Sequence, residues 1–337
     1  MPQETTLVTG ATGHIGNVLV RKLINKGEKV RALILPGEDT SSLQGVDVEK
    51  VEGDVLDLSS LWKSFQGVRG VFHLAGVISI MPGENPLVRK VNVEGTINVL
   101  KSAMRAGVGR LIYTSSIHAL ARVPHGQVVD ESVGYDPDNP YGAYDRSKAE
   151  ATLEVQKAAS EGLDAVILCP TGVIGPYDFR RSMMGDVIRT AAQRKLTPYV
   201  EGAYDFVDVR DVADGMLAAV EKGKTGESYI LSGQRMSVRY LLETVREVTG
   251  RNFPSIQIPF PLAEFAARFT PWYYLKSKSS PRFTPYSLEV LQSNSVISHA
   301  KATHELGYHP RPLQISIADA IRWFLDHSRG RISTLDA

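Results

Sequence analysis

The chain has 337 residues, of which 43% are hydrophobic, so it can fill a substantial core, and this excludes extensive disorder. Lys and Arg number 38 and Asp and Glu number 37, a balance that excludes a global field for nucleic acid or an anionic membrane. No uncharged run is long enough to span a bilayer, no signal-peptide pattern opens the chain, and the single cysteine, Cys169, excludes an internal disulfide and a multi-cysteine metal site. We therefore expect a cytoplasmic protein with no metal, nucleic-acid or membrane partner.

The first half of the chain alternates short β-branched runs with longer segments of helical period. Strands are predicted at residues 7–9, 30–35, 48–52, 71–74, 111–114 and 165–169, and helices at 15–25, 58–65, 86–105 and 143–159. Several of these strands are apolar on both faces, as buried parallel strands are. The alternation is typical of βαβ units and predicts an α/β fold, a doubly wound parallel Rossmann sheet with helices on both faces.

The alternation ends after residue 169, and the second half is organised differently. A loop-rich stretch contains one predicted helix at residues 183–194, and residues 205–219 and 228–231 are expected to return to the sheet. From residue 237 the pattern predicts a smaller, mainly helical cap. We therefore expect a dinucleotide-binding domain over residues 1–170, with 205–232 returning to it, and a substrate-binding lobe over 171–204 and 233–330.

A glycine-rich turn lies between the first predicted strand and the first predicted helix. Gly10 permits a tight turn, Gly13 lets the backbone approach a pyrophosphate, and Gly16 lets helix and strand pack closely. The N-terminus of the helix offers N–H groups to the same anion. We therefore predict a dinucleotide site, and its loop contacts come from Gly10, Thr12, Gly13, His14, Ile15 and Gly16.

Tyr144 and Lys148 are four residues apart on a predicted helix, so the phenol and the ammonium project from one face. A nearby cation favours the phenolate and is expected to lower the pKa of Tyr144 toward neutral pH. The strand at residues 111–114 leads into Ser115 and Ser116, and a hydroxyl at the carboxyl end of a parallel strand faces the ligand crevice. The pattern predicts acid–base chemistry at a substrate oxygen.

The loop spacing G-x-x-G-x-x-G, the strand-end serine and the Y-x-x-x-K pair together resemble the extended short-chain dehydrogenase/reductase family, which includes NAD-dependent epimerases and dehydratases. Within that family the pattern is most similar to dihydroflavonol-reductase-like and 3β-hydroxysteroid-dehydrogenase-like members. The resemblance implies that Ser116 anchors the substrate oxygen and that Tyr144 donates or accepts the proton. It also implies that Lys148 tunes the pKa of this phenol and binds the nicotinamide ribose.

The resemblance implies further cofactor contacts along the chain. Asp54 would hold the adenine ring, the turn at residues 73–76 would pack against adenine and ribose, and Asn92 would steady the active-site backbone. The segment at residues 170–176 would border the nicotinamide. Beyond the glycine loop, the implied cofactor-binding residues are Asp54, Val55, Leu74, Ala75, Gly76, Asn92, Thr114, Tyr144, Lys148, Pro170 and Val173.

Two departures from the family pattern bear on the reaction. Dehydratases carry Asp-Glu after the active-site hydroxyl residue, where this chain has Ile117 and His118, so dehydration is not expected. Nucleotide-sugar enzymes carry an Arg that grips the diphosphate where this chain has Tyr204, which disfavours such a substrate unless Arg180 or Arg181 compensates. His118 is either a residue of the substrate pocket or a loop histidine without chemistry.

The function that these residues favour is an NAD(P)-dependent oxidoreductase, transferring a hydride between nicotinamide and a ketone, aldehyde or secondary alcohol. One alternative is an NAD-dependent sugar epimerase, which uses the same residues. Another is a non-catalytic dinucleotide-sensing protein, although such proteins typically lose the Tyr/Lys pair that is present here. The aromatic stretch from Phe253 to Tyr274 is either packing of the small lobe, a substrate lid or a partner surface.

The second predicted strand bears on the choice of cofactor. No Lys or Arg occurs between residues 32 and 49, whereas Glu38 and Asp39 lie close to the strand end, where Leu35 stands at the position that reads the ribose. Carboxylates would repel a 2′-phosphate, so we expect NAD, with NADP as the alternative.

The resemblance also implies a homodimer, formed by pairing the helices at residues 86–105 and 143–159 around a two-fold axis. Val93, Ile97 and Leu100 form an apolar stripe that would serve this contact or simply cover the sheet.

Overall fold

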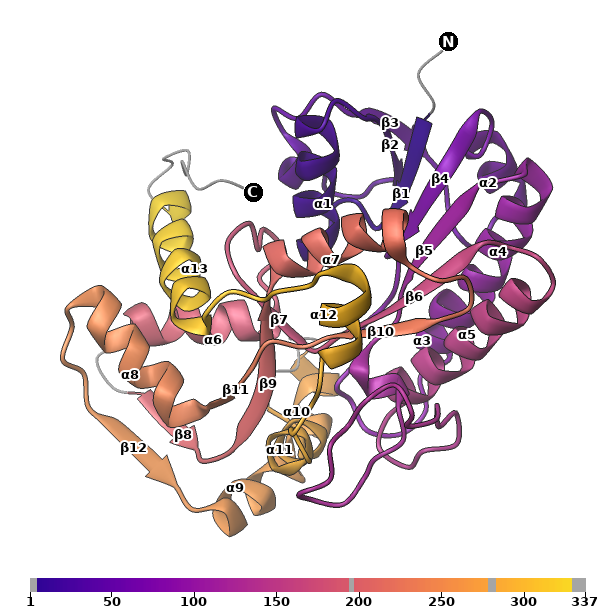
Figure 1. Cartoon of the computed structure of the whole chain (residues 1–337). Coiled ribbons are helices and arrows are strands. Elements are labelled where there is room, and N and C mark those ends of the chain that lie inside the picture. Colours follow the sequence, from indigo (N-terminus) through magenta and orange to yellow (C-terminus); the bar gives the residue numbers. More distant parts are fainter. Residues whose placement is uncertain (1–4, 194–196, 278–282, 329–337) are drawn as a thin grey trace.

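The computed structural model describes residues 5–193, 197–277 and 283–328 (Figure 1). Within them, the main sheet has parallel strands in the order β10-β6-β5-β4-β1-β2-β3. Its strands are β1 (Thr5–Thr9), β2 (Lys29–Ile34), β3 (Glu49–Glu52), β4 (Val68–His73), β5 (Arg110–Thr114), β6 (Ala165–Pro170) and β10 (Ser228–Leu231). The six strands predicted up to residue 169 and the returning segment at 228–231 lie in this sheet, and the predicted doubly wound α/β fold is confirmed. The other segment expected to return, residues 205–219, adds no strand: it belongs to β9 (Ala203–Asp208) of a separate sheet and to a helix that packs on the main sheet.

Helices cover both faces of the main sheet (Figure 1). On one face α1 (His14–Asn25) packs against α7 (Val209–Lys222), and on the other face lie α2 (Leu58–Ser64), α4 (Gly95–Ala106) and α5 (Ala143–Ser160). Because side chains alternate along a strand, the neighbours Leu7 and Val8 of β1 enter different hydrophobic clusters, one on each face. Burial on both faces explains why the strands are continuous apolar runs.

The helix predicted at residues 86–105 is confirmed, but it is not a regular α-helix throughout. It consists of α3 (Pro86–Arg89), a π-helical turn over Lys90–Glu94, and α4. A wider turn takes up an extra residue without disturbing the apolar period on either side, which is why a period count does not detect it. This turn carries Asn92, one of the implied site residues.

The remaining segments form a lobe beside the sheet (Figure 1). It is mainly helical, as predicted, but it also contains two small sheets that the sequence did not predict: β7 (Gly172–Ile174) with β9 (Ala203–Asp208) and β11 (Gln234–Ser237), and β8 (Thr197–Val200) with β12 (Ser255–Ile258). Its helices are α6 (Met183–Gln193), α8 (Val238–Thr249), α9 (Phe260–Ala267), α10 (Thr270–Ser277), α11 (Pro285–Gln292) and α13 (Leu313–Ser328). By contrast, α12 (Ala300–Leu306) packs against α7 and β10 of the main sheet. Residue 194, the end of the helix predicted over 183–194, lies outside the described residues. Among the described helices, none combines the length and the apolar character needed to cross a bilayer.

Candidate active site

The candidate site lies at the carboxyl ends of β1, β4 and β5. The strand order reverses between β1 and β4, and ligands of doubly wound sheets bind in the crevice at this point. β1 leads into the glycine loop, β4 into the turn at Leu74, and β5 into Ser115 and Ser116. Because parallel strands end at one edge of the sheet, motifs that are far apart in the sequence meet here.

The glycine loop has a backbone that side chains would obstruct. Gly10 has a φ of +68°, and a Cβ at this position would lie 2.8 Å from the backbone nitrogen of Ala75. A Cβ at Gly16 would lie 2.1 Å from the carbonyl oxygen of Gly10, and the Gly13 N–H donates to the same oxygen at 3.0 Å. Gly13 caps α1, whose first N–H groups have no helical acceptor. This cradle fits the pyrophosphate of a dinucleotide.

A polar cluster beside the loop was not predicted from the sequence. The Thr12 hydroxyl donates to Glu38 Oε1 at 2.6 Å, and the N–H of Leu35 donates to Glu38 Oε2 at 2.9 Å. Arg180, which follows β7 in the chain, donates to Thr12 Oγ1 at 2.6 Å and forms an ion pair with Glu38. Arg180 is therefore engaged on the cofactor side of the site.

The segment after β7 also forms hydrogen bonds with residues at the start of α1. His14 Nε2 lies 2.9 Å from the carbonyl oxygen of Pro176, and the Asn17 amide donates to the carbonyl oxygen of Tyr177 at 3.1 Å. Ile15 and Val173 are half-buried, and Pro170 is buried at the end of β6.

His73 is a structural residue at the end of β4. Its ring nitrogens lie 2.7 Å from the Thr9 hydroxyl and 3.0 Å from the Thr96 hydroxyl. Burial lowers the pKa of His73 to about 3, so the ring is neutral. The Thr9 hydroxyl also accepts the N–H groups of Leu74 and Ala75, which fixes the turn toward Gly76.

Asp54 and Val55 lie just after β3. Asp54 Oδ1 accepts the N–H of Leu56 at 2.9 Å, so one carboxylate oxygen shapes the turn. Val55 is buried against Gly95, where a Cβ would lie 2.7 Å from a Val55 methyl group. The implied adenine contact of Asp54 stays a prediction.

Asn92 joins the π-helical turn to two other segments. Its Oδ1 accepts the Val77 N–H at 2.7 Å, and its Nδ2 donates to the Val77 carbonyl at 3.0 Å and to Ser147 Oγ at 2.9 Å. A Cβ at Gly76 would lie 3.2 Å from Asn92 Oδ1 and 3.8 Å from Lys148 Nζ. Asn92 thus fixes the backbone after β4 close to the Lys148 ammonium.

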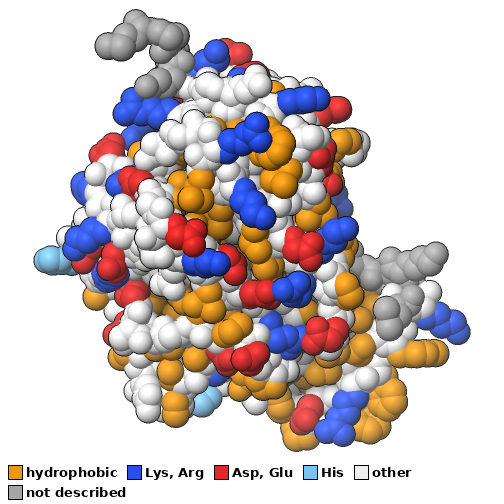
Figure 2. Space-filling view, turned by 90° about the vertical axis from the view of Figure 1, so that its right-hand side faces the viewer, with side chains coloured by type: hydrophobic (Ala, Val, Ile, Leu, Met, Phe, Trp, Pro, Cys, Tyr) orange, Lys and Arg blue, Asp and Glu red, His pale blue; other side chains and the backbone are white. Residues whose placement is uncertain are grey.

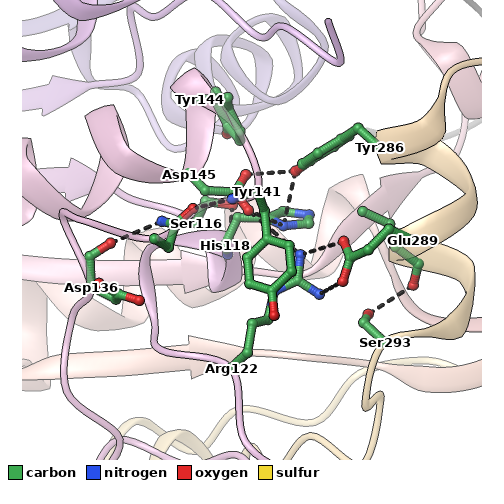
Figure 3. Close-up of polar contacts among 12 residues, drawn as sticks. Ser116, His118, Arg122, Asp136, Tyr141, Tyr144, Asp145, Tyr286, Glu289 and Ser293 are labelled. Atoms are coloured by element: carbon green, nitrogen blue, oxygen red, sulfur yellow. Dashed lines mark hydrogen bonds and ion pairs between the residues drawn. The ribbon is translucent and has the colours of Figure 1, made fainter. Parts of the chain in front are cut away.

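The two strand-end serines point to different places. Ser115 Oγ lies 2.6 Å from Thr152 Oγ1 and is buried against α5. Ser116 caps the short helical turn Ile117–Ala119, where its Oγ accepts the His118 N–H at 3.2 Å (Figure 3). Its hydroxyl also favours the ionised form of the Tyr144 phenol, which Ser115 does not.

Tyr144 and Lys148 both lie at the buried start of α5. Burial raises the pKa of Tyr144 to about 12, although the hydrogen bond with Ser116 acts in the opposite direction. Burial also lowers the pKa of Lys148 to about 8, and its Nζ donates to the Thr114 carbonyl at 2.7 Å. The expected lowering of the Tyr144 pKa is therefore not found: desolvation has the largest effect, and the Lys148 ammonium, which is directed to Thr114, is not among the groups that shift this pKa.

The Thr114 hydroxyl is buried and, within the described residues, has no hydrogen-bond partner. A buried hydroxyl without a partner is costly, so its position at the end of β5 fits a contact with a bound ligand.

On the other side of Tyr144, His118 is the centre of a polar network (Figure 3). Its Nε2 lies 3.0 Å from the Tyr204 hydroxyl, and its Nδ1 lies 3.2 Å from the Tyr286 hydroxyl. Tyr286 donates to Asp145 Oδ1 at 2.5 Å. Burial raises the pKa of Asp145, but His118, Tyr286 and Arg122 together hold it below its ordinary value, so the carboxylate stays ionised.

A pocket of about 630 Å³ opens beyond His118 and Tyr204. Arg122 lies in its wall, but this guanidinium makes two 3.1 Å hydrogen bonds to Glu289 and stacks on Tyr141 (Figure 3). The apolar part of the lining comes from the segment after β5, from α9 and from α11, with Leu120, Val123, Val129, Phe260, Leu288 and Ile297. His118 therefore lines a pocket.

Sequence reasoning missed Arg122, Asp145, Tyr286 and Glu289. Tyr286 and Asp145 are 141 residues apart, and no local pattern links them. None of the four residues is a defining residue of a motif that the sequence analysis identified.

Known proteins resemble this chain over almost its whole length. The profile of the NAD dependent epimerase/dehydratase family matches residues 6–232. Sterol demethylase protein B of Methylococcus capsulatus is 37% identical over 97% of this chain and 100% of that protein. A putative dihydroflavonol 4-reductase of Synechocystis is 34% identical over 95% of this chain and 94% of that protein.

Solved structures share the fold. The crystal structure of gox2253 superposes with a TM-score of 0.84 and 34% identity, covering 97% of this chain and 99% of that one. DesIV, a dTDP-glucose 4,6-dehydratase of Streptomyces venezuelae solved with NAD bound, superposes with a TM-score of 0.77 at 21% identity, covering 97% of this chain and 98% of that one.

Proposed function

Because the chain belongs to the NAD-dependent epimerase/dehydratase family and is an NAD(P)-dependent oxidoreductase, we propose that it interconverts a secondary alcohol and a ketone on an apolar ring system. The observation that carries this proposal is the position of His118, which lines a pocket with a partly apolar wall. The His118 N–H donates to Ser116 Oγ, and its ring packs edge to face with Tyr144. A substrate oxygen bound by Ser116 and Tyr144 would face the cofactor crevice, and the apolar rest of the substrate would extend into the pocket.

The chain's own residues handle the substrate oxygen and its proton. In the reducing direction the Ser116 hydroxyl donates a hydrogen bond to the carbonyl oxygen, and Tyr144 transfers its hydroxyl proton to that oxygen. Lys148 and Asn92 keep the backbone beside them in place, and Lys148 offers its ammonium to the cofactor ribose. When bound, the nicotinamide supplies or accepts the hydride.

The apolar class of substrate is supported by the pocket and by Arg122. A pocket of about 630 Å³ is large enough for a small polycyclic molecule. Arg122 is paired with Glu289 and Arg180 with Glu38, so neither guanidinium is disposed to bind a diphosphate. The relatives named as a sterol demethylase protein and a dihydroflavonol 4-reductase agree with this class.

A substrate screen tests the proposal. Purified protein is incubated with NAD and hydroxysteroids, with NADH and flavanonols, and with UDP- and dTDP-sugars, and the absorbance of the reduced cofactor is followed. We expect turnover with the apolar alcohols or ketones. Interconversion of a sugar nucleotide without net change of the cofactor would instead establish the epimerase alternative.

We further propose that the cofactor is NAD and that the protein is a cytoplasmic homodimer. The position of Glu38 beside Thr12 and Leu35 supports NAD, because a carboxylate there disfavours a 2′-phosphate. Cys169 is a buried thiol, which agrees with a reducing compartment.

The dimer proposal rests on the α4–α5 face, which is turned to the viewer in Figure 2 and has hydrophobic side chains between charged ones. Val93 and Leu100 are buried in the core, so the apolar stripe covers the sheet, and Met104 and Leu153 are the exposed apolar residues on these helices. The molar mass measured by light scattering, with Leu153→Glu as the disrupting variant, tests this contact.

A further inference from the structure

Two short helices of the lobe expose large apolar side chains. Leu262 and Phe265 of α9, Phe269 of the connection, and Trp272 and Tyr273 of α10 are between 57% and 66% exposed. We call these five residues the α9–α10 patch. A soluble surface rarely carries so many aromatic residues together unless they meet a partner.

The patch is held in place by the opposite face of α9. Ala263 and Ala267 are buried against Val200 and Leu288, so this face of the helix is anchored. On the outer side, the rings of Phe265 and Phe269 pack edge to face, with centroids 5.4 Å apart. Figure 2 shows hydrophobic side chains gathered on the projecting lobe at the lower right, at the height where Figure 1 places α9.

Basic side chains accompany the aromatic ones. Arg268 is exposed and pairs with Glu264 at 3.2 Å, and the exposed Lys276 places its Nζ 5.3 Å from the centre of the Trp272 ring. The sequence after α10 adds Lys278 and Arg282, which lie outside the described residues. Between residues 260 and 282 the chain thus has four basic residues and one acidic residue, although its overall charge is near zero.

Trp and Tyr beside Lys and Arg are the side chains that settle at the boundary between water and an anionic bilayer. A second copy of the chain fits less well, because a two-fold contact would place the Arg268 and Lys276 of each copy on the same patch of the other. We propose that the α9–α10 patch docks on the surface of an anionic lipid bilayer. This local site differs from the expectation of no membrane partner, which rests on the balanced net charge and on the lack of an uncharged run of bilayer-spanning length.

The same helix also borders the candidate substrate pocket, because Phe260 and Glu264 of α9 line it. Docking would therefore bring the pocket wall to the bilayer, where apolar ring compounds dissolve. This consequence rests on the proposed function, whereas the docking itself does not. The test below measures binding without substrate, so its failure and the failure of the proposed reaction are distinguishable.

Sedimentation with vesicles tests the docking. The full chain is mixed with vesicles of phosphatidylglycerol and phosphatidylcholine, or of phosphatidylcholine alone, at low and at high salt. We expect binding to the anionic vesicles that salt weakens, because each basic residue near such a surface raises the affinity by roughly fivefold. The variant Phe265→Ser/Phe269→Ser/Trp272→Ser should lose roughly tenfold or more in apparent affinity, and Arg268→Glu/Lys276→Glu should bind anionic vesicles less.

A matched control removes exposed apolar side chains elsewhere. Val220→Ser/Ile315→Ser changes residues of α7 and α13 that are 40% and 48% exposed, and it should bind as the wild type does. All variants are first compared by circular dichroism and thermal melting. The proposal is overturned if the wild type stays in the supernatant, if the triple serine variant binds equally well, or if neutral vesicles bind as strongly as anionic ones. A molar mass that doubles through this patch, without vesicle binding, would make a second copy the occupant and also overturn it.

Discussion

Tyr204 stacks on His118, with ring centroids 5.8 Å apart and planes 15° apart, and its hydroxyl lies 3.0 Å from His118 Nε2. Tyr204 occupies the position at which nucleotide-sugar enzymes of this family carry an arginine. In this chain the residue orients the histidine at the boundary between Tyr144 and the pocket instead.

This contact predicts that the Tyr204 hydroxyl contributes to substrate binding but not to cofactor binding. Tyr204→Phe keeps the ring and removes the hydroxyl, so His118 loses one hydrogen-bond partner. A neutral hydrogen bond is worth about 0.5–1.5 kcal/mol, and we expect KM for the substrate to rise roughly two- to tenfold while the Kd of NADH is unchanged. Steady-state kinetics and cofactor fluorescence measure the two. Tyr135→Phe, which removes a hydroxyl bonded to Ser228 away from the pocket, should leave KM unaltered.

Tyr144→Phe is the test of the proton donor. One oxygen is lost from a buried ring, so the fold and the cofactor affinity should survive, whereas turnover should fall by about 10²-fold or more. Turnover is measured with a substrate from the screen on protein shown by circular dichroism to be folded. Tyr135→Phe, which removes a hydroxyl bonded to Ser228 away from the pocket, should retain most activity. Near-normal turnover in folded Tyr144→Phe would transfer the proton-donor role to another group, with His118 the nearest candidate.

The two adjacent serines provide an internal comparison. Ser116→Ala removes the hydroxyl that lowers the pKa of Tyr144 and is proposed to hold the substrate oxygen, and turnover should fall by roughly 10²-fold with cofactor affinity intact. Ser115→Ala removes a partner of Thr152 instead, and it should lower the free energy of unfolding by about 1 kcal/mol while turnover persists. Turnover and urea unfolding of both variants decide the matter, and equal kinetic losses would show that the assignment to Ser116 alone is mistaken.

The buried ammonium of Lys148 lies in the candidate site and is expected to lower the free energy of unfolding. Burial lowers its pKa from 10.5 to about 8, so between these values the unfolded chain binds more protons than the folded one. Stability therefore rises as pH increases from about 8 toward 10.5, and the full cost of the buried charge is present below pH 8. Lys148→Met should stabilise the protein by about 1–3 kcal/mol at pH 7, measured without added cofactor, and this gain should shrink above pH 8.

The same Lys148→Met variant should lose turnover and bind NADH more weakly. Lys157→Met, on the exposed part of α5, serves as the control and should change neither stability nor kinetics. Unfolding curves at pH 7 and pH 10 provide the comparison, and a Lys148→Met protein that is less stable at pH 7 would contradict the predicted cost of burial.

Glu38 predicts the cofactor preference. Glu38→Gln removes the carboxylate that pairs with Arg180, which leaves this guanidinium for a 2′-phosphate. We expect the wild type to bind NADH more tightly than NADPH, and the variant to shift the ratio toward NADPH by roughly tenfold or more, the scale of a charged hydrogen bond. Asp39→Asn changes a neighbouring carboxylate that contacts Ser41, and its ratio should stay as in the wild type. Tighter NADPH binding by the wild type would refute the preference.

The sequence by itself determined the parts of this protein that depend on near neighbours. The strands of the main sheet, the glycines at 10, 13 and 16, and the four-residue step from Tyr144 to Lys148 are local patterns, and each was identified from its spacing. These motifs follow parallel strands, and the carboxyl ends of parallel strands lie at one edge of the sheet, so the motifs meet there.

Only the tertiary structure decided what surrounds these groups. Glu38 and Arg180 are 142 residues apart, and Asp145 and Tyr286 are 141 residues apart, so no local period encodes these pairs. The pKa of Tyr144 is a further example: the four-residue spacing predicted that Lys148 would lower it, but desolvation by the folded chain raises it. Local spacing sets which groups are neighbours on one helix, whereas burial and the partners that other elements bring set their protonation and their contacts.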